Sequence, residues 1–240
     1  MKSLAITFCI IFLCGCTEEY FFTKALECEA AGEYEKAIEY LDKVISKNPL
    51  RTWAYVNRAA DKEELSDFTS AIEDYSKAIS IDSMLVAGYM GMAHLYMKQQ
   101  DYSSALANYN SAISKSGIIE TDNKIIAFST GNAATPNRFS KYEKSNKYED
   151  PFYPTEEMFF ERAVAYFFLD NLDFALRDFD FCLSNEISTK MERECHYWIG
   201  HIFLKIGQIE DGCNALKTSI TLGDNYAKED YNKYCECNNK

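Results

Sequence analysis

A repeat of fixed length is the feature of this sequence that most constrains its fold. Small residues recur 34 positions apart in two series, at Ala25, Ala59 and Ala93 and at Ala37, Ala71 and Ala105. Only small side chains let two helix backbones approach closely, so these series predict pairs of packed antiparallel helices. A helix pair repeated at this period predicts an all-α fold, an α-solenoid.

Five units follow from this period, and they cover residues 18–51, 52–85, 86–119, 156–189 and 193–226. The last two units keep the paired small positions, as Ala163 with Ala175 and Gly200 with Gly212. This joint pattern resembles the tetratricopeptide repeat family, which implies a right-handed α-solenoid of antiparallel helix pairs. The sequence departs from the family at Lys24, Arg58 and Arg162, where an apolar residue is commoner.

A stretch without the repeat pattern separates the third and fourth units. It lacks the paired small residues and contains Gly131, Pro136, Pro151 and Pro154, which argue against another helix pair. Residues 124–129 favour a short extended segment. We expect repeats 1–3 over 16–119, an insert over 120–155, repeats 4 and 5 over 156–226, and a capping helix and tail over 227–240. Both a functional loop and a passive surface insertion fit the insert.

The first fifteen residues have the pattern of an export signal. Lys2 precedes an apolar run from Leu4 to Leu13, which is too short to span a membrane as a mature helix. The run ends in Leu-Cys-Gly-Cys, which resembles the lipobox of bacterial lipoproteins, where the cysteine, here Cys16, is acylated after cleavage. The resemblance implies a lipid anchor in a Bacteroidota-like cell envelope, in the outer membrane and facing either the periplasm or the exterior. The alternatives are an uncleaved anchor and an ordinary signal peptide with a chance cysteine.

The composition excludes several classes of function. The formal net charge is -12, and such a surface repels the phosphates of nucleic acids, so we expect no nucleic-acid partner. The sequence has no Gly-rich phosphate loop, nucleophile elbow or HExxH helix, so we expect no enzyme and no cofactor. His196 and His201 fall on different faces of one predicted helix, and we expect no metal site.

The family resemblance also implies a binding surface. In tetratricopeptide repeat proteins the first helix of each unit lines a groove through its second, fifth, ninth and twelfth positions. The corresponding residues here include Trp53, Val56, Met90, His94, Met97, Phe160, Val164, Phe167, Tyr197 and His201. Most are apolar or aromatic, so we expect a non-catalytic scaffold that binds a peptide or protein partner. The alternative is a structural or self-associating envelope spacer whose groove is filled by its own insert.

Two cysteines near the end of the chain suggest a covalent bond. Cys213 and Cys235 lie on neighbouring predicted helices, and this ending resembles that of many Bacteroidota tetratricopeptide proteins, in which cysteines recur at both places. An exported chain reaches an oxidising compartment, where disulfides form. The resemblance therefore implies a disulfide that holds the capping helix on the last repeat. Two buried thiols are the alternative.

Overall fold

The computed structural model describes residues 17–117, 119–121, 124–126 and 155–236. The predicted export segment with Cys16, most of the 120–155 insert and the tail after residue 236 lie outside the described residues. The chain divides into two compact units. The described part of the first unit ends at Lys98, and that of the second begins at Gln99. The division therefore falls between the two helices of the third predicted repeat.

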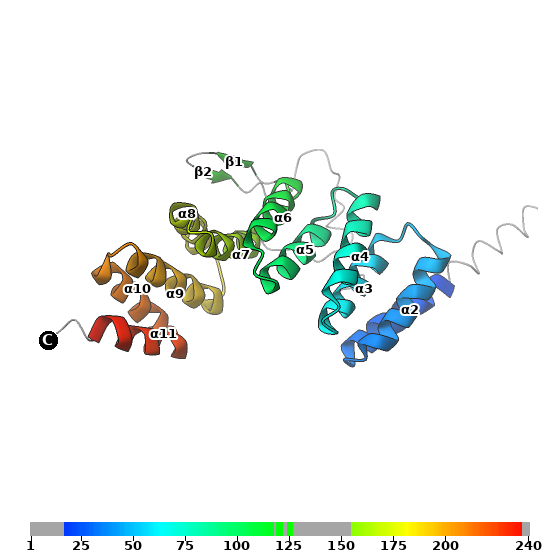
Figure 1. Cartoon of the computed structure of the whole chain (residues 1–240), viewed down its shortest axis with the longest axis horizontal. Coiled ribbons are helices and arrows are strands. Elements are labelled where there is room, and N and C mark those ends of the chain that lie inside the picture. The colour runs from blue at the N-terminus through cyan, green and yellow to red at the C-terminus, as the bar shows by residue number, and fades with distance from the viewer. Residues whose placement is uncertain (1–16, 118, 122–123, 127–154, 237–240) are drawn as a thin grey trace, which may run out of the picture. The chain divides into compact units, whose positions relative to one another are not determined.

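The first unit consists of helices that pack in sequence order (Figure 1). They are a helix over residues 17–30, α2 (Tyr34–Lys47), α3 (Thr52–Glu64), α4 (Phe68–Ile81) and α5 (Val86–Lys98). Helix α2 packs on α3, α3 on α4, and α4 on α5. Phe22, Leu41 and Val44 form part of the core and are at most 1% exposed. Burial of one apolar face, more than helix propensity, stabilises helices of this length.

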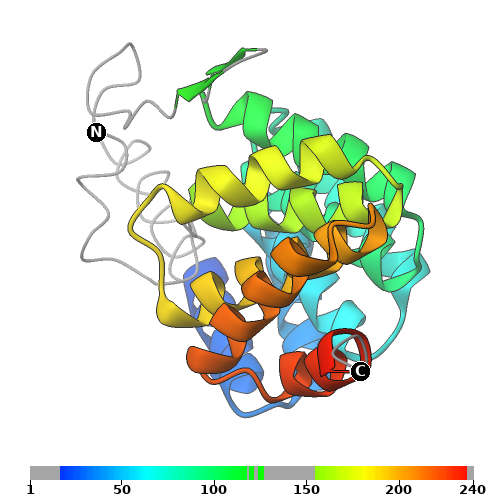
Figure 2. The same ribbon diagram turned by 90° about the vertical axis from the view of Figure 1, so that its left-hand side faces the viewer.

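The second unit is built in the same way and ends in a cap. Its described helices are α6 (Tyr102–Lys115), α7 (Thr155–Phe168), α8 (Leu172–Leu183), α9 (Thr189–Lys205), α10 (Ile209–Thr221) and α11 (Asn225–Tyr231), followed by the π-helical stretch η1 (Asn232–Glu236). Helix α9 packs on α10, and α11 lies beside α10 (Figure 2). Two short strands, β1 (Ile119–Thr121) and β2 (Lys124–Ile126), pair in antiparallel fashion at the start of the insert.

The small residues of the repeat pattern are buried as the packing argument requires. Ala25, Ala37, Ala59, Ala71, Ala93, Ala105, Ala163 and Ala175 are all 0% exposed. In the last repeat even a methyl group is too large, because a Cβ atom on Gly212 would lie 3.0 Å from the carbonyl oxygen of Gly200 and 2.8 Å from Leu204 Cγ. Close approach of α9 and α10 therefore depends on these two glycines.

The turn inside each repeat has a shared conformation that the repeat pattern does not predict. The same position of every unit has a positive φ, at Gly32 (73°), Ser66 (62°), Gln100 (60°), Asp170 (63°) and Gly207 (84°). A left-handed residue lets the next N–H bond back to the end of the first helix, as from Asp67 N to Lys62 O at 2.8 Å. Three of the five residues are not glycine, so no glycine pattern marks the turn.

We expect Ser66→Gly to stabilise the protein by about 0.5–1 kcal/mol. The left-handed region costs a residue with a Cβ about 1–2 kcal/mol, and the greater flexibility of unfolded glycine offsets part of that gain. The matched control is Ser80→Gly, at an exposed serine within α4, which should lose about 1 kcal/mol. Urea unfolding followed by circular dichroism measures both. A loss of stability in the Ser66 variant would contradict the reasoning.

Two of the departures from the family are partners in internal ion pairs. Arg58 of α3 donates from Nε to Asp74 Oδ2 of α4 at 2.8 Å, and Lys62 Nζ reaches the same oxygen at 2.7 Å. Arg162 of α7 donates to both carboxylate oxygens of Asp178 in α8, at 2.7 and 2.9 Å. Each pair joins the two helices of one repeat. The arginines therefore replace an apolar contact with a charged one that is satisfied inside the helix pair.

Candidate functional site

The ten predicted groove residues fall into two groups by burial. Val56, Met90, Phe160 and Val164 are at most 9% exposed and pack inside their own units. Trp53, His94, Met97, Phe167, Tyr197 and His201 are partly exposed. The first group has little surface to offer a partner. The accessible part of the predicted groove is thus narrower than the sequence pattern suggested, and its role in binding stays a prediction.

A pocket of about 490 Å³ lies at the end of the second unit. It is lined by Phe167 of α7, by His201, Leu204 and Lys205 of α9, by Ile209, which begins α10, and by Lys233 and Tyr234 of η1. Two of the predicted groove residues, Phe167 and His201, are in this lining. The lysines and Tyr234 were not predicted as site residues, because the repeat pattern says nothing about what the cap contributes.

A hydrogen-bonded cluster connects the predicted groove to the cap. Asp230 of α11 accepts a hydrogen bond from the Tyr197 hydroxyl at 3.1 Å and lies 3.1 Å from His201 Nε2. The rings of Tyr197 and His201 meet edge to face, with centres 4.6 Å apart. Burial and the nearby charge of Asp230 raise the pKa of Tyr197 to about 12. Tyr197 therefore acts as a hydrogen-bond donor at neutral pH and fixes the position of α11 against α9.

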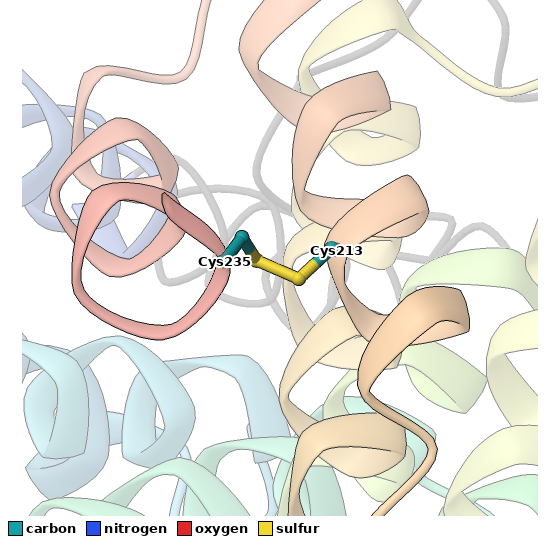
Figure 3. Close-up of a disulfide and its surroundings, with 2 residues drawn as sticks. All are labelled: Cys213 and Cys235. Atoms are coloured by element: carbon teal, nitrogen blue, oxygen red, sulfur yellow. A yellow bond between two sulfur atoms is a disulfide. The ribbon is translucent and has the colours of Figure 1, made fainter. Parts of the chain in front are cut away.

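A disulfide holds the cap against the last repeat. It joins Cys213 of α10 to Cys235 of η1, with the Cα atoms 5.7 Å apart (Figure 3). These are the two cysteines whose pairing the family resemblance implied. Cys235 lies next to the pocket residues Lys233 and Tyr234 in the chain. The bond therefore also restrains the side of the pocket that the cap supplies.

One buried and one partly buried carboxyl group lie in the first unit, outside the pocket. Asp61 of α3 is 2% exposed, and Glu29, at the end of the first described helix, is partly buried. Neither Asp61 Oδ2 nor Glu29 Oε1 has a hydrogen-bond partner among the described residues. Burial, together with the charge of Glu29 and then of Glu64, raises the pKa of Asp61 to about 8, and burial raises that of Glu29 to about 7. Both groups favour the protonated form in the folded chain.

This pair predicts that the first unit loses stability as the pH rises. The folded pKa values lie above those of the unfolded chain, so the folded state binds more protons, and stability falls between about pH 4 and pH 8. Asp61→Asn keeps the neutral form at every pH. At pH 8.5 we expect it to raise the free energy of unfolding by at least about 1.4 kcal/mol, the equivalent of one pKa unit.

Urea unfolding of both proteins at several pH values measures this effect. The two curves should converge near pH 4, where Asp61 is protonated in the wild type as well. Asp67→Asn is the matched control, because Asp67 is exposed and its pKa is lowered by the Ser70 side chain and backbone. A wild-type protein whose stability rises steadily from pH 5 to pH 8 would contradict the assignment.

Two further observations concern the described residues as a whole. Among them, no helix is both long and apolar enough to cross a membrane. In the same part of the chain, no three histidine, cysteine, aspartate or glutamate side chains gather in a way that could hold a metal ion.

Comparison with known proteins bears on the fold. The family model described as a tetratricopeptide repeat matches residues 18–49 and 86–114, which fall in the first and third predicted units. A sequence search of curated proteins found no match. These two stretches are therefore similar to tetratricopeptide repeats.

Solved structures extend the likeness over most of the chain. A thermophilic TPR protein from Thermus thermophilus is 14% identical, with a TM-score of 0.52 over 90% of this chain and 98% of that one. YrrB, described as a TPR protein with an unusual peptide-binding site, is 14% identical, with a TM-score of 0.54 over 76% of this chain and 74% of YrrB. The Cut9-Hcn1 hetero-tetramer of the APC/C contains a chain that is 13% identical. The TM-score is 0.62, over 93% of this chain and 37% of that one.

At these identities the likeness shows the fold alone. The predicted fold class is confirmed, because the described chain is built of successive helix pairs and its solved neighbours are tetratricopeptide repeat solenoids. Proteins with this fold commonly serve as scaffolds for protein–protein interaction.

Proposed function

We propose that this chain is a lipid-anchored, non-catalytic scaffold that binds a peptide or another protein along the first helices of its repeats. The pocket of the second unit carries the binding role, because it combines the groove residues Phe167 and His201 with aliphatic and cationic side chains. Among its structural neighbours, YrrB is described as having a peptide-binding site, and Cut9 is assembled with Hcn1. Such partners fit a solenoid with a partly apolar surface.

Photo-crosslinking tests the binding role. A benzoylphenylalanine at position 167 reports on the pocket, and the same group at position 174 is the matched control. Phe174 is an exposed phenylalanine of α8 that does not line the pocket. We expect discrete adducts of higher mass from position 167 in intact cells and none from position 174. Equal adducts from both positions, or none from position 167, would argue against the pocket as the binding site.

The lipid anchor is a separate part of the proposal. It rests on the lipobox-like ending at Cys16, which we propose is acylated and holds the protein in the outer membrane. Cells grown with an alkyne fatty acid should label the wild type and Cys28→Ala but not Cys16→Ala. The label should travel with outer-membrane fractions on a density gradient. Label that persists in the Cys16 variant would disprove acylation at this residue.

A further inference from the structure

The first described helix begins beside the loop that joins α2 to α3. Near the start of this helix, Glu18 accepts a hydrogen bond from Asn48 Nδ2 at 3.2 Å, and Glu19 lies 3.6 Å from Arg51 Nη2. Asn48 and Arg51 belong to the loop, since α2 ends at residue 47 and α3 begins at residue 52. The start of the first helix, the end of α2 and this loop thus form one edge of the first unit. We call it the N-terminal edge, and it consists of residues 17–21 and 43–51.

Apolar and aromatic side chains are exposed on the N-terminal edge. Leu50 is 73% exposed, and Tyr20 is 54% exposed. The Tyr20 ring meets the ring of Phe21 edge to face, with centres 5.6 Å apart. Side chains of a helix lean toward its N-terminus, so both rings lean toward the end of the helix that follows Cys16. The edge therefore presents apolar surface on the side where the predicted lipid anchor is attached.

Two exposed lysines of α2 lie near these rings. Lys43 Nζ lies 5.7 Å, and Lys47 Nζ 5.8 Å, from the centre of the Phe21 ring. The acidic groups of the edge, Glu18 and Glu19, already have polar partners in the loop. Aromatic rings at the level of lipid headgroups, with lysines that extend toward the phosphates, are typical of protein surfaces at a membrane interface. The side chains of this edge suit such a position.

The covalent chain would keep this edge close to an acylated Cys16. The first described helix begins at residue 17, directly after Cys16, so no linker separates it from the anchor. A chain covers at most about 3.6 Å per residue, which places the Cα of Tyr20 within about 14 Å of the Cα of Cys16. Acyl chains on Cys16 enter the bilayer and hold that residue at its surface. The N-terminal edge then stays beside the lipid headgroups.

We infer that the N-terminal edge docks on the phospholipid surface that holds the anchor. Leu50 and Tyr20 enter the interfacial layer, and the ammonium groups of Lys43 and Lys47 contact lipid phosphates. This inference rests on the proposed lipid anchor and deepens it, because it gives the first unit a fixed orientation on the membrane. The opposite end of α3, where Leu65 follows the helix, faces away from the bilayer.

Charge and tethering favour lipid over a protein as the occupant of this edge. The chain has a net charge of -12, so anionic lipids repel it as a whole, and an edge with local cations is the part suited to lie against them. The anchor also presents lipid to this edge at a high effective concentration. A protein partner or a second copy of the chain would have to displace that lipid.

Photo-crosslinking to lipid tests the inference on the full acylated chain. The protein is purified and reconstituted in vesicles of phosphatidylethanolamine and phosphatidylglycerol, with benzoylphenylalanine at position 50 or, as the matched control, at position 65. Leu65 is also an exposed leucine, but the thirteen residues of α3, about 20 Å of helix, separate it from Leu50. We expect at least about tenfold more phospholipid adduct at position 50, because the headgroup layer is thinner than α3 is long.

Charge reversal on α2 tests the part played by the lysines. Lys47→Glu should lower the yield of lipid adduct at position 50 by about twofold to fivefold, since one cation near an anionic surface contributes about a factor of five. Lys36→Glu is the matched control. It changes an exposed lysine near the start of the same helix, away from the N-terminal edge, and should leave the yield unchanged. Equal yields from the two variants would contradict a contact between Lys47 and lipid phosphates.

Mass spectrometry of the same samples separates this inference from the proposed anchor. An acylated chain with equal lipid adducts at positions 50 and 65 would overturn the inference and leave the anchor standing. Adducts at position 50 that carry a second copy of the chain in place of a lipid would assign the edge to self-association and also overturn it. A purified chain without acyl groups would refute the anchor and, with it, the docking that depends on it.

Discussion

Asp178→Ala is expected to lower the free energy of unfolding of the second unit by about 3–5 kcal/mol, the range seen when one partner of a buried ion pair is removed. Arg162 is 1% exposed, and Asp178 is 0% exposed. The variant leaves a guanidinium in the interior without the carboxylate that accepts two of its hydrogen bonds, at 2.7 and 2.9 Å. Thermal and urea unfolding of the isolated variant measure the loss.

Arg162 has further contacts besides Asp178. The guanidinium donates to Asn110 Oδ1 at 3.0 Å and lies 4.7 Å from the centre of the Phe159 ring, and both of these partners are uncharged. Replacing the whole pair by apolar residues, as in Arg162→Met with Asp178→Leu, removes the unpaired charge and should recover most of the stability. Such recovery separates an unpaired charge from a general packing defect.

The control for this prediction is an exposed ion pair. Lys24 and Glu27 pair within one helix turn, and their side chains are 36% and 57% exposed. Glu27→Ala should cost less than about 1 kcal/mol. If the double variant Arg162→Met, Asp178→Leu is as unstable as Asp178→Ala alone, the explanation by an unpaired charge is wrong.

Loss of the Cys213–Cys235 disulfide is expected to cost about 3 kcal/mol. The bond closes a loop with a sequence separation of 22 residues, and its removal restores the conformational freedom of that loop in the unfolded chain. Without it, noncovalent contacts hold the cap, among them the burial of Ala227 and Cys235 against Leu216 and the contacts of Asp230. Cleavage by proteases after Lys228 or Lys233 should therefore become faster.

Thermal unfolding with and without reductant measures this loss. Reductant should lower the unfolding temperature of the wild type and of Cys28→Ser, but it should have no effect on the Cys213→Ser, Cys235→Ser double variant. Cys182 and Cys195 are not in disulfides in this structure. An equal response of the double variant to reductant would show that another disulfide carries the effect.

The repeat pattern was enough to predict the helix pairs and their close approach. Helix formation depends on the spacing of apolar side chains along the chain, and the separation of two helices depends on the size of the residues between them. Both quantities can be obtained from the residues themselves. The burial of Ala25, Ala59 and Ala163 and the tight contact at Gly200 and Gly212 follow from this.

The residues of the internal ion pairs also follow the repeat in the sequence, with the arginines at positions that depart from the family pattern. Arg58 and Asp74 are separated by 16 residues, as are Arg162 and Asp178. In the third and fifth units the equivalent positions hold Met92 with Asn108 and Ile199 with Ala215, so neither unit has the charge pair. The signal for these pairs is that Arg and Asp occur together at these two positions in the second and fourth units and are both absent from them in the third and fifth.

The tertiary structure alone decided which side chains are accessible and what surrounds the pocket. Val56, Met90 and Phe160 occupy groove positions of the family, yet they are covered within their units. Lys233, Tyr234 and Asp230 come from outside the repeats, and the folding of α11 and η1 onto α10 brings them beside α9. The raised pKa of Asp61 has the same origin, since it depends on burial and on Glu29, 32 positions away in the sequence. A periodic sequence determines contacts within and between like units, but burial, charge and shape at an irregular end depend on side chains distant in sequence that only the folded chain brings together.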